Sequence, residues 1–144
     1  QFDENGNLIM SKTVDPDGVL TEKNIMKYNE KGQPVEREYY VEENEWSEKS
    51  NSEYDENGHL IKETITYMDG SETVSTFEYE NDKIVSVVAV DIDDDEITES
   101  VQRKFNENGI LLKEEKFEYG ELVSSEENTF DDNGDLVHRK TFDS

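Results

Sequence analysis

Four aspartates near the middle of the chain could bind a metal ion. They are Asp91, Asp93, Asp94 and Asp95, and Glu96 follows directly. Ca²⁺ prefers hard oxygen ligands, and here several carboxylates lie within one short segment. The segment is therefore a candidate calcium site, and the alternative is a solvated acidic turn that holds no ion.

Three aromatic residues form a second candidate site, for binding rather than for catalysis. Tyr39 and Tyr40 are adjacent, and Trp46 follows across a predicted turn at Glu43-Asn44. Exposed aromatic rings can stack on sugar rings or anchor a protein partner. The alternative is that Trp46 and one of the tyrosines fill the apolar face of a sheet.

The residues offer little for catalysis. Both histidines, His59 and His138, are predicted to be exposed strand residues, and no serine lies in a known nucleophile motif. Two carboxylates at a suitable separation could hydrolyse a glycoside, but with 38 acidic residues this observation selects no particular pair. We therefore expect a protein that is not an enzyme and that has no cofactor apart from the candidate calcium.

The charge excludes several classes of partner. The chain of 144 residues has 38 acidic and 14 basic side chains, a net charge of −24. Binding to nucleic acid needs lysine and arginine to replace the counterions of phosphates, and anionic lipid makes the same demand. We therefore expect neither nucleic acid nor an anionic membrane surface as a partner. Cysteine is absent, which excludes a disulfide scaffold and a thiolate site.

One sequence phrase recurs six times and organises the chain: an aromatic residue, a polar tetrad that usually ends in glycine, and an aliphatic pair. Clear copies read FDENGNLI, YDENGHLI and FDDNGDLV. Looser turn signals lie roughly halfway between the copies. The tetrads end at Gly6, Gly32, Gly58, Asp82, Gly109 and Gly134, so the repeat is close to 26 residues long.

This spacing suits strands joined by tight turns better than it suits helices. We therefore predict an all-β fold, an antiparallel up-and-down meander of about a dozen strands in one extended or curled sheet. Residues 1–144 form a single β-hairpin repeat domain in this interpretation. The phrase itself marks a hairpin turn, with a strand on either side.

The turn chemistry predicts which residues pair. A tetrad such as Asp-Glu-Asn-Gly suits a type I turn followed by a glycine with positive φ, which places the aromatic residue opposite the first aliphatic residue. The tetrad after Tyr79 is one residue shorter, and a two-residue loop of Asn81 and Asp82 keeps the same pairing. The predicted pairs are Phe2–Leu8, Tyr28–Pro34, Tyr54–Leu60, Tyr79–Ile84, Phe105–Leu111 and Phe130–Leu136.

The segment Ile84–Ile92 is apolar at nearly every position, unlike the rest of the chain. A run of this kind is usually buried on both faces. We expect a central strand at which the sheet folds on itself. The alternative is a surface for self-association, because such a strand would aggregate if it were exposed.

The segment YDENGHLIKETITY, from Tyr54 to Tyr67, resembles the YD repeat of the Rhs and teneurin families, as do FDENGNLI and FDDNGDLVHRKTF. Members of these families are mostly bacterial surface or secreted proteins built of β-hairpin repeats, and some form closed shells around a toxin. This chain departs from the pattern because its period is longer and its copies are too few for a large shell. The resemblance implies a hairpin-repeat architecture and an extracellular or cell-surface location on a bacterium, and it implies no catalytic residue.

The expected function is that of a non-enzymatic extracellular or cell-surface repeat module with a structural or binding role, whose partner is a protein or a glycan. One alternative is an acidic inhibitor or immunity-type protein that covers a basic partner, since the charge would steer that association. Another alternative is a carboxylate glycosidase. Because Phe2 already holds the aromatic position, we also expect that a strand upstream of Gln1 is missing, as after removal of a secretion signal.

Overall fold

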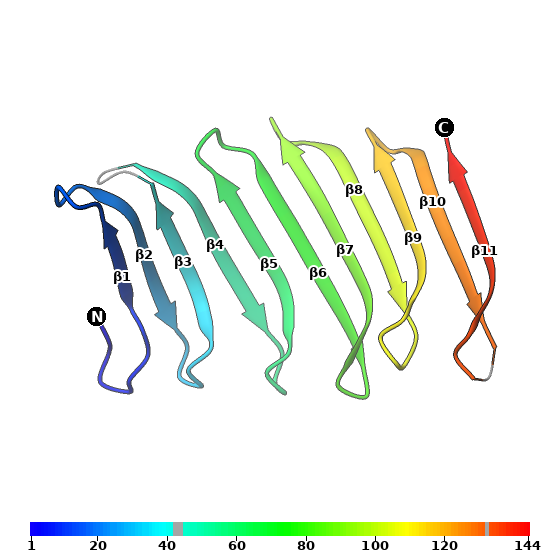
Figure 1. Cartoon of the computed structure of the whole chain (residues 1–144), viewed down its shortest axis with the longest axis horizontal. Coiled ribbons are helices and arrows are strands. Elements are labelled where there is room, and N and C mark those ends of the chain that lie inside the picture. Colours follow the sequence, from blue (N-terminus) through cyan, green and yellow to red (C-terminus); the bar gives the residue numbers. More distant parts are fainter. Residues whose placement is uncertain (42–44, 132) are drawn as a thin grey trace.

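The computed structural model describes residues 1–41, 45–131 and 133–144, in which strands and turns make up one sheet (Figure 1). Eleven antiparallel strands lie in the order of the chain, so the predicted all-β meander is confirmed. The sheet is open, because β1 and β11 form its two edges. The strands are β1 (Met10–Val14), β2 (Leu20–Tyr28), β3 (Pro34–Tyr40), β4 (Trp46–Tyr54), β5 (Leu60–Tyr67), β6 (Glu72–Glu80), β7 (Lys83–Asp93), β8 (Glu96–Phe105), β9 (Leu111–Glu118), β10 (Glu121–Phe130) and β11 (Leu136–Asp143).

The described residues include no helix with the length and apolar character needed to span a membrane.

The turns have the predicted chemistry. In the first loop, the Gly6 N–H donates to the Asp3 carbonyl at 3.2 Å and the Asp3 N–H donates to the Asn7 carbonyl at 2.9 Å. Gly6 has a φ of 86°, which a side chain would resist. In the shorter loop, Asn81 and Asp82 both have positive φ, at 50° and 63°, as a two-residue hairpin turn requires.

The six predicted aromatic–aliphatic pairs are all confirmed by the strand register. The register then shifts beside the pair: Tyr54 faces Leu60 but Glu53 faces Lys62, so Ile61 is an extra residue. The second aliphatic residue of the phrase is therefore a β-bulge, which the sequence pattern did not indicate. The equivalent extra residues are Val35, Val85, Leu112 and Val137.

The tyrosines of the phrase connect each hairpin to the one before it. Each tyrosine hydroxyl donates a hydrogen bond to the carbonyl oxygen of the aliphatic residue in the preceding copy of the phrase. These bonds add side-chain contacts to the backbone pairing of β1 with β2, β3 with β4 and β5 with β6. They run from Tyr28 to Leu8 at 2.9 Å, from Tyr54 to Pro34 at 2.8 Å and from Tyr79 to Leu60 at 3.0 Å.

Alternation along the strands gives the sheet two faces. The tyrosine face, as we call it, carries Tyr28, Tyr54 and Tyr79. The valine face is the opposite one and carries Val74 and its partner Val90.

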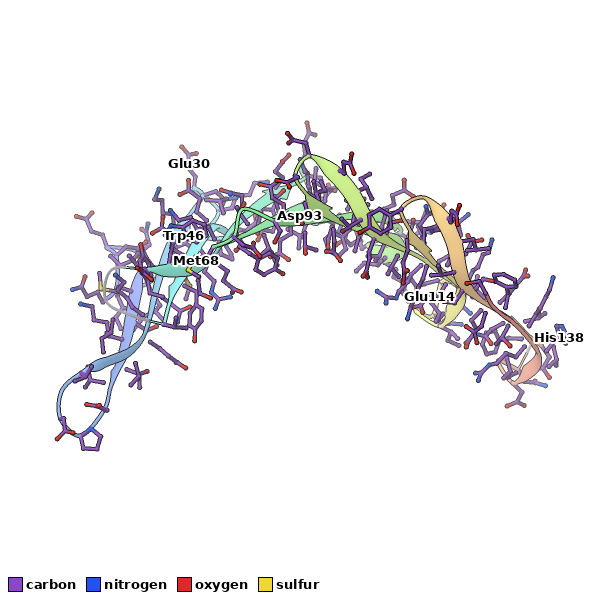
Figure 2. All side chains as sticks on the ribbon, turned by 90° about the horizontal axis from the view of Figure 1, so that it is seen from above. Glu30, Trp46, Met68, Asp93, Glu114 and His138 are labelled. Atoms are coloured by element: carbon purple, nitrogen blue, oxygen red, sulfur yellow. The ribbon has the colours of Figure 1, made fainter. Side chains whose placement is uncertain are left out.

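In the part of the chain that the structure describes, no second layer covers either face. Among the described residues no hydrophobic side chain is buried, and Ile84 of β7 is 36% exposed. The expectation that Ile84–Ile92 is buried where the sheet folds on itself is therefore wrong, because β7 pairs with β6 and β8 inside the same single layer. Figure 2 shows this layer from above as a curved arch with side chains on both sides. The repeated bulges give a physical cause for the curvature, since a bulge bends its strand and increases the local twist.

Candidate functional site

Two of the predicted binding aromatics lie side by side on the valine face. Tyr40 at the end of β3 is the register partner of Trp46 at the start of β4. On the other side, Tyr40 is paired with Lys23 of β2, and Lys23 is paired with Lys12 of β1. We call these four residues the lysine–aromatic row. It crosses four adjacent strands, because directly paired residues share a face.

The row is held by contacts between cations, rings and one carboxylate. The Lys23 ammonium lies 3.6 Å from the centre of the Tyr40 ring, and the Lys49 ammonium lies 4.8 Å from the Trp46 ring, both within cation–π range. The Tyr40 hydroxyl donates to Glu38 at 2.6 Å, and Lys49 forms an ion pair with the same carboxylate at 3.2 Å. Both rings are half-buried and therefore keep part of their surface in solvent.

Charge in this cluster shifts two pKa values in opposite directions. The hydrogen bond from the Tyr40 hydroxyl, followed by the bond from Lys49, lowers the pKa of the Glu38 carboxyl. The same bond, with some burial, raises the pKa of Tyr40. Glu38 therefore stays ionised at neutral pH and Tyr40 stays protonated, which keeps the hydrogen bond between them.

Tyr39 does not join the other two aromatics. It is paired with Asn24 and Glu48, and it lies on the tyrosine face because consecutive strand residues point to opposite faces. The Arg37 guanidinium lies 5.4 Å from its ring. The structure thus groups Tyr40 with Trp46 and separates Tyr39, while the predicted Glu43-Asn44 turn lies outside the described residues.

The lysines of this site were missed in the sequence. Lys12 and Lys23 are far from Trp46 along the chain, and only the register of two successive hairpins brings them into one row. The alignment of Lys12 and Lys23 with Tyr40 could in principle be predicted, because the confirmed aromatic–aliphatic pairs fix the register of each hairpin near its turn. Counting outward from those pairs fails near the row, where the register shifts again between Tyr39 and Tyr40.

A groove of about 840 Å³ adjoins the row beside the turn that joins β1 to β2. Lys12 lies in its wall, so the groove and the row share a cation. Polar and apolar surface contribute about equally to its walls, and Val14 and Val19 are 55% and 62% exposed. The lining residues are Lys12, Val14, Gly18, Val19, Leu20, Thr21 and Val41.

A second groove, of about 690 Å³, lies on the tyrosine face. Its apolar lining includes Tyr79, Ile84 and Phe105, which are members of the aromatic–aliphatic pairs. Lys83 at its rim already donates to the Glu107 carbonyl at 2.6 Å. This groove is therefore formed by residues that pair across the turns of the fourth and fifth copies of the phrase.

The predicted calcium ligands are spread over a strand and a turn. Asp91 accepts a hydrogen bond from the Thr73 hydroxyl at 2.6 Å, and Asp93 ends β7. Asp94 and Asp95 form a two-residue turn with φ values of 48° and 65°. Within the described ranges no group of three or more histidine, aspartate or glutamate side chains is placed to hold a metal ion. Calcium binding here stays a prediction, which a rise in melting temperature with millimolar Ca²⁺, lost in Asp94→Ala, would support.

His59 is not the exposed strand residue that the sequence predicted. It lies in the third phrase's loop with its side chain 18% exposed, and its ring stacks on Tyr79 with centroids 4.5 Å apart. Its two ring nitrogens face Asp55 at 3.0 Å and Asp82 at 3.2 Å. The prediction failed because the sequence does not indicate that Tyr79 and Asp82 of the next hairpin lie beside this loop. His138, on β11, is exposed as expected.

Comparisons with known proteins give a family but no activity. No curated protein matches the sequence. One similar solved structure is the crystal structure of a protein of unknown function from Bacteroides fragilis, with 14% sequence identity over 84% of this chain and 91% of that chain and a TM-score of 0.21. A family model described as "Uncharacterised protein" matches residues 1–91. The chain therefore belongs to this family of uncharacterised proteins.

Proposed function

We propose that this protein is a non-enzymatic repeat module that works on the surface of a bacterium or outside it, and that it binds a glycan or a protein partner. The observation that carries the proposal is the pairing of Tyr40 with Trp46 on an uncovered face, with a lysine ammonium against each ring. Both rings keep part of their surface in solvent beside the ammonium groups, and this part offers apolar area for a ligand.

The architecture supports a binding role. A repeat sheet without a core has two long faces that contact solvent, and extended repeat surfaces commonly serve as binding surfaces. The turns and strand pairs account for most of the repeated residues, so the phrase itself leaves no group for catalysis. The side chains of the row are outside the phrase, so the turns do not require them.

Binding can be tested with labelled protein on a glycan array and on extracted bacterial surface proteins. Wild-type protein is expected to retain a ligand that Tyr40→Ala and Trp46→Ala lose. The matched control is Tyr119→Ala, because Tyr119 is 74% exposed and lies at a turn on the other half of the sheet. Equal loss in the Tyr119 variant, or retention in both site variants, contradicts the proposed site.

The location is a separate part of the proposal. It is supported by the resemblance to YD-repeat proteins, and protease treatment of intact cells tests it. Degradation of the protein in intact cells is the expected result, and complete protection until the cells are lysed contradicts it.

An acidic inhibitor of a basic protein is the second candidate, and the charge of −24 favours it. Charge-driven association weakens as salt screens it. A cationic protein that is captured at low salt and released at high salt would replace the first proposal with this one. Turnover in a broad glycoside hydrolase screen would instead favour the carboxylate glycosidase.

Self-association through Ile84–Ile92 is a further proposal. Val88 and Val90 lie on the valine face, which no other element covers within residues 1–41, 45–131 and 133–144. Sedimentation velocity over a range of concentrations tests it. A dimer that is lost in Val88→Thr/Val90→Thr supports this surface, and a monomer at all concentrations contradicts it.

A further inference from the structure

We propose that copies of this chain stack face to back, with the valine face of one copy packed on the tyrosine face of the next around β7. This inference rests on the proposed self-association through Ile84–Ile92, because it names the surface of the second copy that covers this strand. It goes beyond that proposal in using both faces of the sheet, so that a stack can continue past a dimer.

Strand β7 is apolar on both of its faces. Its apolar side chains divide between them: the valine face has Val88, Val90 and Ile92, and the tyrosine face has Ile84, Val87 and Ala89. A strand of this composition is usually buried on both faces, but none of these side chains is buried in the single sheet. A dimer in which two valine faces meet would cover one side of β7 and leave the other exposed, whereas a face-to-back stack covers both.

On the valine face, the apolar surface of β7 continues onto the neighbouring strands. Val74, Val90, Phe117 and Leu122 belong to one line of register partners that crosses β6 to β10, with Ser100 as its polar member. Leu122, at the far end of this line, is 38% exposed. The valine face therefore presents a continuous apolar line that a second copy could cover.

The tyrosine face offers a recess in the same part of the sheet. The groove of about 690 Å³ lies beside β7, and Ile84, Val87 and Phe105 help to line it. Val101 of β8 is the register partner of Ala89 and extends the apolar surface along this face. Side chains from the valine face of a second copy can enter such a recess, as the inner faces of two sheets interdigitate when they pack about 10 Å apart.

The chain exposes more surface than a folded monomer of its mass usually does. Its accessible surface is 10124 Å², whereas globular monomers of 16.7 kDa expose about 7,600 Å². The excess is about 2,500 Å², because the described strands form a single layer. A stable interface of ordinary size buries about 800 Å² on each partner, so the two interfaces of a copy inside a stack would remove about 1,600 Å². The excess surface is large enough to supply both interfaces.

The curvature of the sheet favours contact between unlike faces. Figure 2 shows the sheet as an arch with an inner and an outer side. Two arches nest when the outer side of one lies in the inner side of the other, so that their surfaces stay in contact along the curve. Two outer sides would touch only near the top of the arch, and two inner sides would meet only at their ends.

The charges of the two faces also favour unlike pairing. Asp91, Glu99, Glu118 and Glu121 are successive register partners on the tyrosine face of β7 to β10, and like charges in such positions repel each other. Two tyrosine faces packed together would bring two such rows together. The lysines of the strands lie on the valine face, with Lys116 as the exception, so a valine face is the better match for these carboxylates.

The net charge sets a limit on the stack. Each copy carries a charge of −24, and this charge opposes association until salt screens it. Stacking should therefore strengthen as the salt concentration rises, whereas capture of a basic partner should weaken. The lysine–aromatic row remains open to solvent on the end copy, whose valine face no other copy covers.

Sedimentation velocity in high salt over a range of protein concentrations tests the inference. Wild-type protein is expected to form species whose mass exceeds that of two copies and rises with concentration. The valine-face variant Val88→Thr/Val90→Thr and the tyrosine-face variant Val87→Thr/Val101→Thr should each stay monomeric, because every contact needs one face of each kind. Threonine suits a strand, and circular dichroism verifies that the variants are folded.

An equimolar mixture of the two variants gives the most specific measurement. The valine-face variant keeps an intact tyrosine face, and the tyrosine-face variant keeps an intact valine face. The mixture is therefore expected to form a dimer with one copy of each variant. This dimer should not grow further, since both of its outer faces are substituted.

The matched control is Val14→Thr/Val19→Thr. These two valines are 55% and 62% exposed and lie at the first hairpin, far from β7 in the strand order. The control is expected to associate as the wild type does. Loss of association in this variant as well would overturn the inference, because association would then depend on exposed apolar surface in general.

The remaining outcomes separate stacking from the proposals on which it rests. If the tyrosine-face variant still forms a dimer that the valine-face variant loses, stacking is wrong and self-association through Ile84–Ile92 stands. Stacking is also wrong if the mixture of the two variants stays monomeric. A wild-type monomer at all concentrations contradicts both. Ligand binding by Tyr40 and Trp46 is measured separately, so the binding module stands or falls by its own test.

Discussion

The Nε2 atom of His59 lies 3.2 Å from an Asp82 carboxylate oxygen, so one hairpin loop is bridged to the loop of the next hairpin. The other ring nitrogen faces Asp55 in its own loop at 3.0 Å, and the ring stacks on Tyr79 at an interplanar angle of 14°. In a sheet without a core, contacts of this kind replace the burial that usually holds neighbouring elements in place.

Removing this bridge should destabilise the protein modestly. His59→Ala deletes the stack on Tyr79, which is worth about 0.5–1.5 kcal/mol beyond its buried area. The contact with Asp82 should add little, because that carboxylate is 86% exposed and surface ion pairs contribute weakly. Urea denaturation measures the loss. His138→Ala is the control, with a change within about 0.5 kcal/mol expected at its exposed position, and equal stability of both variants would contradict the bridging role.

Asp55 should make the protein sensitive to acid. Hydrogen bonds, first from the His59 backbone N–H, hold the pKa of the Asp55 carboxyl below its ordinary value. A lowered folded-state pKa means that the stabilisation is complete above the unfolded-state pKa and is lost as the pH falls through the folded-state value, that is, below about pH 4. Melting temperatures between pH 2 and pH 7 should therefore depend less on pH in Asp55→Asn.

The chain supplies its own control for this variant. Asn29 and Asn106 occupy the equivalent position, and the Asn106 side-chain oxygen accepts two backbone N–H bonds, at 2.9 Å and 3.0 Å. Asparagine therefore keeps the turn and removes only the charge. Asn106→Asp should steepen the acid side of the profile, and the same slope in wild type and both variants would be evidence against this account.

Tyr54→Phe should weaken the connection between the second and third hairpins. The variant removes the hydroxyl that donates to the Pro34 carbonyl at 2.8 Å and leaves the ring opposite Leu60. A hydrogen bond of this type contributes about 0.5–1.5 kcal/mol net. Phe105 and Phe130 show that the phrase tolerates phenylalanine, so the sheet should still form. Chemical denaturation measures the change, and a variant as stable as wild type would show that the bond contributes nothing.

Gly58→Val should cost more than the same change at Gly109. Both glycines have positive φ, at 94° and 76°, which a β-branched residue resists at a cost of about 1–3 kcal/mol. At Gly58 a Cβ would also lie 3.2 Å from the Gln33 amide, which donates to the Gly58 carbonyl, whereas Gly109 has nothing within 4 Å. Thermal unfolding compares the two. An unchanged melting temperature for Gly58→Val would contradict the turn assignment.

The sequence by itself determined the meander and the contacts nearest each turn. Asp, Asn and Gly in the repeated tetrad restrict the loop to a few conformations, and these place Phe2 opposite Leu8 or Tyr54 opposite Leu60 whatever the rest of the chain does. Such pairs lie within one hairpin, so local chemistry is enough to predict them.

Contacts between successive hairpins were decided only by the tertiary structure. The bridge from His59 to Asp82 and the alignment of Lys12 with Tyr40 both depend on how one hairpin's register adds to the next. A shift of one residue moves a side chain to the other face, and the bulges introduce such shifts at both ends of the strands. The absence of a second layer was decided in the same way: the apolar run of β7 indicates burial, but burial requires a covering element, and every strand of the described chain pairs within the one sheet.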